Sequence, residues 1–505
     1  MLLPFNLLEG GIMLEDYSDQ VQQRMRKLER IRERGVDPYP ARSSRSHTAA
    51  EAIAAFEEAE ASGNDGPTVQ VTGRLRAIRV MGKSSFAHIE DGSGRIQIYL
   101  RQNDLGEEPY EIFKRDIDLG DFIGVEGYLF RTRSGEVTVH AESFELLTKT
   151  LHPLPAKWHG LKDIETRYRR RYLDLIANED ARKIFKTRTR IVTAMRRFLD
   201  DQGFIEVETP TLQPIYGGAM ARPFTTHHNA LDMTLYLRIS DELYLKRLIA
   251  GGFEKVYEIC KDFRNEGVST KHNPEFTQME CYWAYADYSD MMWLTENMVA
   301  FIAEQALGST RFTFQGQVVD VTPPWRRWPL RDAIKELAGI DYMQYPTLEA
   351  LSAEVRRQGL AISPQPTWGK LIDELLGEIV EPTLIQPTFV KDYPIDISPL
   401  AKVSPDDPQH VERFEIFVGG LETGNAYSEL NDPLAQRERF DQQGLGAKAG
   451  DEEAHPMDED YILALMHGMP PTGGLGVGVD RLAMLLTDQT SIREVILFPH
   501  MRSGD

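Results

Sequence analysis

The sequence predicts an α+β protein, with a small β-barrel ahead of a larger domain built on an antiparallel sheet flanked by helices. Three observations support this class. Residues 69–147 alternate apolar and polar side chains with the period of two that strands require. Residues 255–285 hold two apolar, β-prone runs around a polar loop, which is the pattern of a long-looped hairpin. Residues 473–487 run from a glycine-rich strand into a helix.

Size, charge and cysteine content place the chain among large globular proteins. With 505 residues it has room for roughly two to four domains. No run approaches the roughly 18 apolar residues of a membrane span. A net charge of −21 argues against nonspecific nucleic-acid binding by the whole surface, although a local basic patch stays open. The two cysteines, Cys260 and Cys281, cannot build a disulfide framework and favour buried thiols in a cytoplasmic protein.

Residues 1–65 are predicted to form a helical extension. The apolar start lacks the basic region of a signal peptide and is expected to be a simple extension. Apolar residues at helical spacing predict helices over 14–35 and 49–61. The first helix is crowded with Lys and Arg, which suits either a solvated charged face or an arm for nucleic acid. Both interpretations stay open, because Glu29 and Glu33 dilute the positive charge.

Residues 66–150 are predicted to form a closed barrel. Strand-like runs separated by turn signals give five strands, and a short helix over 109–114 would lie between the third and fourth. Five strands with one long crossover in about 80 residues are typical of an OB-fold.

OB-folds bind single strands by stacking bases on aromatic rings. Phe86 and Gln97 would lie on adjacent strands, with Arg79 nearby. A ring, an amide and a guanidinium together suit unpaired RNA bases. Taken alone, Phe86 fits the barrel core somewhat better than a base-stacking surface.

Residues 151–180 resemble a linker, since a Pro-rich stretch is followed by a strongly basic one. Such a hinge could help two domains hold one nucleic acid, or it could be an ordinary region of interdomain ion pairs. Beyond it, a helix over 181–201 and a strand ending at Pro210 begin the domain 181–505. A mostly helical insertion is expected at about 325–385.

The loop of the predicted hairpin carries charge at both of its roots. Arg264 and Glu266 lie on the outgoing side, and His272 lies on the returning side beside Phe276. A guanidinium takes phosphate oxygens as a fork, and an aromatic ring takes the face of a base. The pattern therefore suits a nucleotide, although a surface hairpin with solvated charges explains it equally well.

Residues 411–431 form a second cluster of polar side chains on predicted strands. Glu415, Glu422 and Glu429 lie there among apolar neighbours, with Asn425 and Tyr427 between them. Burying three carboxylates is costly unless a cation meets them. Mg²⁺ shared with substrate phosphates is one solution, and a substrate ammonium is another.

The glycine-rich segment 473–487 is neither a dinucleotide fingerprint nor a P-loop. Arg481 would begin its helix at the positive end of the dipole, where it suits a polyphosphate. Elsewhere, Gly218 would let a substrate approach the backbone, and Glu242 would begin another helix, where it could be a simple dipole partner.

Three motifs, in this order behind a barrel, resemble the class II lysyl-tRNA synthetases over about residues 14–500. The helix and strand ending in Pro210 resemble motif 1, which builds the dimer interface of that family. The sequence FRNEG…HNPEF, residues 263–276, resembles motif 2, and GLGVGVDR, residues 474–481, resembles motif 3. The stretches RPFTTHHNALDM, ELYLKRL and ETGNAYSELNDP resemble the lysine enzyme more than its aspartate and asparagine relatives.

The resemblance implies an OB-fold anticodon-binding domain, a class II catalytic domain and a reaction. ATP and L-lysine would form a lysyl-adenylate, and the lysyl group would pass to tRNA(Lys). The resemblance also implies Mg²⁺ as cofactor, a homodimer through motif 1, and a cytoplasmic protein without a membrane anchor.

It further implies roles for individual residues. Catalytic roles fall to Arg264 at the α-phosphate and Arg481 at the γ-phosphate and adenine. The residues implied for ATP are Arg264, Glu266, His272, Asn273, Phe276, Glu415, Glu422 and Arg481, of which Glu415 and Glu422 would hold Mg²⁺. Those implied for lysine are Gly218, Glu242, Glu280, Tyr282, Asn425, Tyr427 and Glu429. Those implied for the anticodon are Arg79, Phe86, Gln97 and Glu136.

One departure from the family and three alternatives remain. Asp262 stands where the family more often has a polar amide, so it would add a negative charge beside the ATP site. A paralogue that lysylates a translation factor would lack the barrel at 69–147. A non-catalytic RNA-binding protein would not need Arg264 and Arg481, and an enzyme that makes lysine-modified lipids would carry membrane spans.

Overall fold

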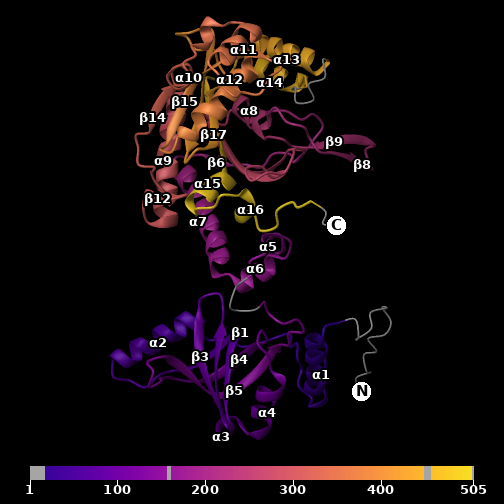
Figure 1. Ribbon diagram of the computed structural model, residues 1–505. Helices are drawn as coiled ribbons and strands as arrows, with labels where there is room; N and C mark the ends of the chain where they lie inside the picture. Colours follow the sequence, from indigo (N-terminus) through magenta and orange to yellow (C-terminus); the bar gives the residue numbers. More distant parts are fainter. Residues whose placement is uncertain (1–16, 156–160, 449–455, 503–505) are drawn as a thin grey trace. The chain divides into compact units, whose positions relative to one another are not determined.

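The computed structural model describes residues 17–155, 161–448 and 456–502. The chain divides into two compact units, Met1–Gly160 and Leu161–Asp505, each of which has its own core (Figure 1). The apolar start of the chain lies outside the described residues. No helix within the described ranges is long and apolar enough to cross a membrane.

The first unit contains the predicted OB-fold barrel. Its strands are β1 (Thr68–Met81), β2 (Ser84–Glu90), β3 (Arg95–Arg101), β4 (Phe122–Arg131) and β5 (Val137–Thr148). They close in the order β1-β2-β3-β5-β4, with β3 and β5 parallel. Two helices, α3 (Gln102–Leu105) and α4 (Glu107–Asp116), connect β3 to β4. Alternate side chains of the strands fill the interior, where Tyr110 and Phe113 of α4 join them.

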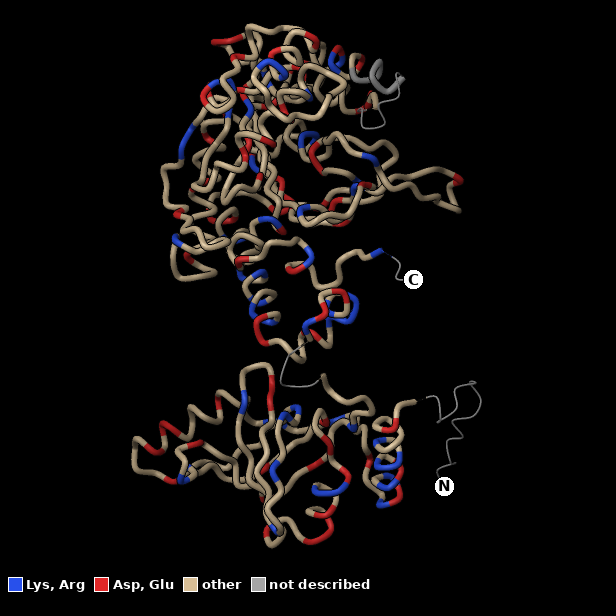
Figure 2. The backbone as a smooth tube through the Cα atoms, viewed as in Figure 1, with Lys and Arg blue, Asp and Glu red and all other residues tan. Residues whose placement is uncertain are grey.

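Two helices precede the barrel, α1 (Asp19–Glu33) and α2 (Ala49–Ala61). Figure 2 shows acidic residues among the basic ones of α1. Lys27 pairs with Asp118 at 2.6 Å, Arg30 pairs with Asp116 at 2.6 Å, and Arg24 donates to the Leu119 carbonyl at 2.9 Å. These three cations are therefore engaged within the unit, which favours a packed charged face over an arm for nucleic acid.

The expected linker is shorter than the sequence suggests. Residues from 161 onward belong to the second unit, where they form α5 (Ile164–Arg169) and α6 (Arg171–Ala177). Arg171 is fully buried and donates to the carbonyl of Leu497 at 3.0 Å and to Asp174 at 2.6 Å. Part of the basic stretch at 161–180 is therefore packed within the second unit, where carbonyls and an acid accept from Arg171.

An eight-stranded sheet organises the second unit, in the order β14-β15-β16-β17-β18-β11-β10-β6. Its strands are β6 (Ile205–Glu206), β10 (Lys255–Phe263), β11 (Glu275–Ala284), β14 (Arg326–Pro329), β15 (Thr388–Pro394), β16 (His410–Val418), β17 (Leu421–Ser428) and β18 (Thr472–Gly478). The central pairs are antiparallel, as predicted, whereas β14 and β6 join the two edges in parallel. The strand expected before Pro210 is reduced to the two residues of β6.

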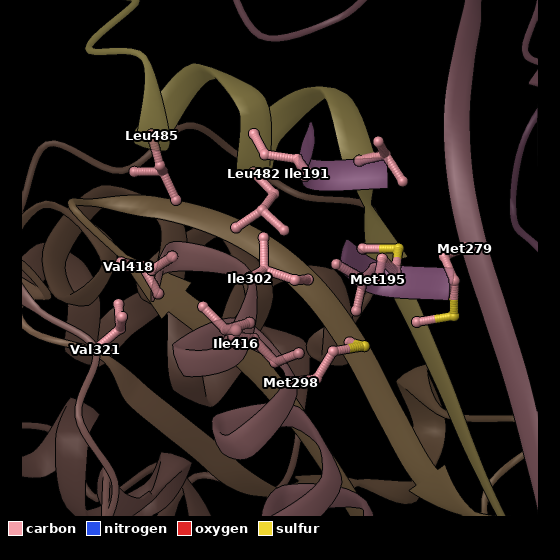
Figure 3. Packing of buried hydrophobic residues seen from close by; sticks show 14 of the residues in the cluster. Ile191, Met195, Met279, Met298, Ile302, Val321, Ile416, Val418, Leu482 and Leu485 are labelled. Atoms are coloured by element: carbon pink, nitrogen blue, oxygen red, sulfur yellow. The ribbon is translucent and has the colours of Figure 1, made fainter. Parts of the chain in front are cut away.

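Helices cover one face of this sheet: α7 (Glu179–Asp201), α9 (Tyr288–Leu307), α15 (Val479–Leu486) and α16 (Ile492–Val495). In Figure 3, Leu482 and Leu485 of α15 point toward the residues of α9 and β16. The close-up labels Ile191, Met195, Met279, Met298, Ile302, Val321, Ile416, Val418, Leu482 and Leu485. This apolar layer holds the central strands in place, so their opposite face is free to carry polar groups.

A second core lies under the insertion. Its helices are α10 (Leu330–Ala338), α11 (Leu348–Arg357) and α12 (Trp368–Leu375), with helical turns η2 (Tyr342–Gln344), η3 (Leu376–Val380), η4 (Glu381–Thr383) and η5 (Ile395–Ile397). The insertion is helical as expected, but it opens with the edge strand β14. The remaining elements are β7 (Leu212–Gln213), β8 (Thr225–His228), β9 (Met233–Leu237), α8 (Glu242–Ala250), β12 (Arg311–Phe314), β13 (Gln317–Asp320), α13 (Pro433–Lys448) and α14 (Glu459–His467).

Candidate active site

A cavity of about 400 Å³ lies on the central strands β11, β17 and β18, beside the hairpin loop 264–274. Most of the side chains that the sequence assigned to ATP or lysine line this one cavity. They are Gly218, Glu242, Arg264, Glu266, His272, Asn273, Phe276, Glu280, Tyr282, Glu422, Asn425, Tyr427 and Arg481. Glu415 and Glu429, although described, are not part of its wall.

The predicted hairpin is formed by β10 and β11, with Phe263 paired with Glu275 at the root of the loop. Strand alternation puts Phe276, Glu280 and Tyr282 on the face that lines the cavity. The guanidinium carbon of Arg264 lies 5.0 Å from the centroid of the Phe276 ring. A phosphate-binding cation and an aromatic platform therefore stand side by side at one end of the cavity.

Arg481 connects three separate parts of the chain at the same end. It begins α15, donates to Glu422 of β17 at 2.9 Å, and contacts His272 Nε2 of the loop at 3.3 Å. Burial raises the pKa of Glu422, but Arg481 and Arg413 outweigh burial and leave that pKa lowered. Burial and then Arg481 lower the pKa of His272, which favours its neutral ring.

Two of the loop residues have local partners. The Asn273 side chain donates to the Glu275 carbonyl at 2.5 Å and accepts from the His500 amide at 3.2 Å, so it shapes the return of the loop. Glu266 is exposed, and its backbone amide donates to the Arg264 carbonyl at 2.9 Å.

Glu415 and Glu422 lie on the adjacent strands β16 and β17, and the charge of Glu422 raises the pKa of Glu415. Burial is the largest cause that raises the pKa of Glu415, to about 8, against the opposing charge of Arg413 at 2.6 Å. Asp373 of α12 adds a third nearby carboxylate. Such a donor set suits Mg²⁺, because a divalent cation would stabilise the ionised form of Glu415.

The other end of the cavity is rich in carboxylates. Glu280 accepts hydrogen bonds from Ser240 at 2.9 Å, Gln278 at 2.7 Å and Tyr282 at 3.0 Å. Burial, and next the charge of Glu242, raise the pKa of Glu280 to about 8. An ammonium group that enters the cavity would stabilise the ionised form of such a buried carboxylate.

Gly218 stands over this end in a conformation that suits glycine, with φ of +90°. A β-carbon there would lie 2.7 Å from Ser240 Oγ and 3.0 Å from Glu242 Cβ. The missing side chain therefore keeps the carboxylate end open.

Glu429 lies behind the wall, at 2% exposure, where it pairs with Lys246 of α8. Lys246 is fully buried and also pairs with Glu242, which does line the cavity. The structure therefore places Glu429 one layer behind Glu242, and its role in lysine binding, which the resemblance implies, stays a prediction.

Asp262 is also buried behind the site. It lies 3.5 Å from Arg238, accepts from the Cys260 thiol at 3.7 Å, and does not line the cavity. Burial raises its pKa to about 6, against the charges of Arg264 and Arg238. The carboxylate of Asp262 therefore does not face the part of the cavity assigned to ATP.

Asp262, Asp241 and Glu280 offer ligand atoms within 4.8 Å of one another. Burial, and next the charge of Glu280, raise the pKa of Asp241 well above its usual range, which favours the neutral form of Asp241. Asp241 also takes the N-cap position of α8 without a capping side-chain bond, while Ser240 Oγ accepts from the Glu242 amide at 3.1 Å. Both cysteines, Cys260 and Cys281, are free and buried, as expected.

A polar and aromatic surface covers the outside of the barrel. Phe86 alternates with the buried Ser85 and Ala87, so it points away from the barrel core, and its ring lies 4.7 Å from that of Tyr99. Arg79 pairs with Phe86 across β1 and β2.

Gln97 and Glu136 lie on the same side of the barrel. Gln97 donates to Glu136 at 2.7 Å, and His88 contacts the other oxygen of Glu136 at 2.7 Å. The four residues assigned to anticodon reading are therefore brought together on neighbouring strands β1, β2 and β3 and at the start of β5.

Several cavity residues were missed from sequence: Ser240, Lys271, Gln278, Arg413 and Asp480. Arg413 donates to Asn425 at 3.0 Å and to Glu415 at 2.6 Å, so it orients both. Gln278 stands two residues before Glu280 on β11, and Arg413 stands two residues before Glu415 on β16. The period of two along each strand was therefore a usable signal for both.

Comparison with known proteins gives a consistent result. Residues 163–502 match the family described as tRNA synthetases class II (D, K and N), and residues 69–147 match an OB-fold nucleic acid binding domain. A lysine–tRNA ligase of Pelotomaculum thermopropionicum is 55% identical over 98% of this chain and 97% of its own. Those of Roseiflexus castenholzii and Bacillus subtilis are 57% and 53% identical, over 95% and 97% of this chain and 98% of theirs. The chain belongs to the lysine–tRNA ligases of class II.

Proposed function

We propose that this cavity joins lysine to ATP and that the chain then transfers the lysyl group to tRNA. The observation that carries the proposal is the division of one cavity into two chemical ends. Arg264, Phe276 and Arg481 form a cationic, aromatic end, while Glu242 and Glu280 form an acidic end. A nucleoside triphosphate fits the first and an amino acid with two ammonium groups fits the second.

Recognition of lysine rests on replacing the water around its ammonium groups. Glu280, held by three hydrogen bonds, offers a charged acceptor for one ammonium, and Glu242 offers another. An uncharged analogue would leave these buried acids without a cation, which penalises it strongly. Tyr282, Asn425 and Tyr427 complete the wall around the substrate.

The first step is an in-line attack of the lysine carboxylate on the α-phosphate. Arg264 binds the α-phosphate and takes up the charge of the pentavalent transition state. Pyrophosphate then leaves toward Arg481 and His272, which are already in contact at 3.3 Å. Catalysis comes mainly from orientation and charge neutralisation.

Glu415 and Glu422 would hold Mg²⁺, which would neutralise charge on the triphosphate when bound. Arg413 and Arg481 keep these carboxylates in place from either side. Glu266 would meet the adenine amino group, and Phe276 would stack beneath the ring.

In the second step the terminal ribose hydroxyl of tRNA attacks the carbonyl of the adenylate, and AMP leaves. We assign anticodon reading to the outer face of the barrel, where Phe86 stacks a base and Gln97 with Glu136 meets base edges. The presence of this barrel supports tRNA(Lys) rather than a protein as the acceptor.

We further propose that two copies pair through α7 and β6 in the cytoplasm. The segment after α7 exposes apolar side chains, with Ile205 at 51% and Leu212 at 46%. Such exposure is typical of a surface that another protein covers.

The direct test of the first step is ATP–pyrophosphate exchange with each amino acid in turn. Lysine should support exchange far above aspartate, asparagine and norleucine. Equal exchange with norleucine, which has the same chain length but no side-chain ammonium, would contradict the role of the acidic end.

A further inference from the structure

A buried lysine lies directly behind the acidic end of the cavity. Lys246 is 0% exposed, and its ammonium bridges the carboxylates of Glu242 and Glu429. The rings of Tyr282 and Tyr427 face the same ammonium at 5.8 and 5.9 Å. All four of these neighbours are residues that the sequence resemblance assigned to lysine binding.

The position of Lys246 follows from the local structure. It comes one helical turn after Glu242 on α8, so both side chains project from the same face of the helix. Glu429 follows β17 and reaches the ammonium from the sheet. A β-carbon at Gly474 would lie 1.9 Å from Glu429 Oε1, so the glycine of β18 leaves the space that this carboxylate fills.

Little else around the ammonium can neutralise these charges. The surrounding cluster of buried side chains is mainly apolar and contains Leu243, Leu245, Ile249, Val256, Leu400, Phe440 and Tyr461. Beyond Lys246, the positive charge of Arg413 lowers the pKa of Glu242, and the negative charge of Glu280 raises the pKa of Glu429. Arg413 is itself engaged with Glu415.

The balance of charge around Lys246 is therefore uneven. One ammonium meets two carboxylates, so the group carries one negative charge in excess when both are ionised. A pair that served only the fold would be balanced, because an uncompensated buried charge is costly. The excess charge belongs to a group that includes Glu242, which lines the cavity, and one substrate ammonium would balance it.

We propose that Lys246 is a positioning residue that sets the specificity of the acidic end. Its ammonium holds the carboxylates of Glu242 and Glu429 together and, when both are ionised, leaves one negative charge for the side-chain ammonium of the substrate. The inference rests on the proposed function, since the substrate it concerns is lysine.

The effects of Lys246 on its neighbours agree with this role. Burial is the largest cause that raises the pKa of Glu242 and of Glu429, and Lys246 is the largest charge that lowers both. Glu242 and Glu429 in turn hold the pKa of Lys246 well above its usual range despite burial. The titratable groups that face the ammonium are Glu242 of α8, Tyr282 of β11, Tyr427 of β17, Glu429 directly after β17, and Tyr461 of α14.

Three variants test the charge balance through the KM for lysine in ATP–pyrophosphate exchange. Lys246→Met leaves two unbalanced carboxylates, and Glu429→Gln leaves no excess charge. Each should raise KM on the order of tenfold or more, with a smaller effect on kcat, because Lys246→Met removes the bridge that positions the two carboxylates and Glu429→Gln removes the excess negative charge. The double variant K246M/E429Q has the wild-type excess of one and should bind lysine more tightly than Glu429→Gln alone.

The pH profile separates this role from simple packing. Without Lys246 the two acids keep their protons to higher pH, so the fall of KM with rising pH should move to higher pH in Lys246→Met. The double variant should return it to the wild-type position. If Lys246→Met does not fold, the KM for lysine of Glu429→Gln and of the double variant can still be compared. A lower KM in the double variant supports the inference, because only the balance of charge differs in its favour.

Additive losses in the double variant, or an unchanged KM in Lys246→Met, would overturn the inference while the proposed function stood. A wild-type chain that gives no lysine-dependent exchange would instead overturn the proposed function itself, and the inference with it.

Discussion

The side chain of Arg188 on α7 donates a hydrogen bond of 2.5 Å to Asp480 on α15. The second oxygen of Asp480 accepts from the Thr277 amide of β11 at 2.7 Å. One buried carboxylate therefore joins the helix of motif 1 to the strand of motif 2 and the helix of motif 3. The residue that follows it is Arg481, so the same contact fixes the start of the helix that carries a catalytic arginine.

Replacing Asp480 by Ala should destabilise the second unit by roughly 2–4 kcal/mol, because a buried amide and a largely buried guanidinium lose their acceptor. The midpoint of thermal or urea unfolding measures the change. Lys183→Ala on the same helix is the control, since that side chain is 65% exposed and should leave the midpoint unaltered. Equal midpoints for both variants would show that the carboxylate is dispensable.

Arg264→Ala should lower the rate of lysine-dependent ATP–pyrophosphate exchange on the order of 10²–10³-fold, because a charge-stabilising donor at the reacting phosphate is lost. Arg311→Ala offers a matched control, since Arg311 is 72% exposed and lies outside the cavity. A rate for Arg264→Ala close to that of this control would remove Arg264 from the catalytic role.

Gly218→Ala should raise the KM for lysine about tenfold or more, because the new β-carbon would displace Ser240 and Glu242. Gly252→Ala is the control for backbone strain alone. Its φ of +102° is also left-handed, but no atom lies within 4 Å of the new β-carbon. If both variants change KM equally, strain and not the carboxylate end explains the effect.

Phe86→Ala should weaken charging of tRNA on the order of tenfold while sparing ATP–pyrophosphate exchange, because only the second substrate stacks on this ring. Phe86→Leu keeps an apolar side chain without an aromatic face and should behave like the Ala variant. Loss of exchange as well as charging would assign Phe86 to the stability of the barrel rather than to RNA binding.

The sequence was sufficient for the elements whose periodicity is clean. Alternation predicted the barrel and the hairpin β10–β11, and the resemblance to the class II synthetases assigned Phe276, Glu280 and Tyr282, which lie on one cavity-facing side of β11. Phe86 lies outside the barrel core because it alternates with the buried Ser85 and Ala87, a position that its aromatic character alone does not predict.

The sequence did not predict how deeply individual side chains are buried or which charged residues pair with each other. A basic run such as 167–171 has the same composition whether it is solvated or buried, and only the fold brings the Leu497 carbonyl to Arg171. Glu280 lies in the middle of β11 and Glu429 directly after β17, and of the two only Glu280 lines the cavity. Lys246 could not be linked to Glu429 because 183 residues of chain separate the two, and no local pattern records that contact.

Aminoacylation with purified tRNA and each amino acid in turn tests the central claim most directly. We predict stable charging of tRNA(Lys) with lysine alone, dependent on ATP and lost in Arg264→Ala. Charging with aspartate or asparagine, or no charging with lysine, would contradict the account.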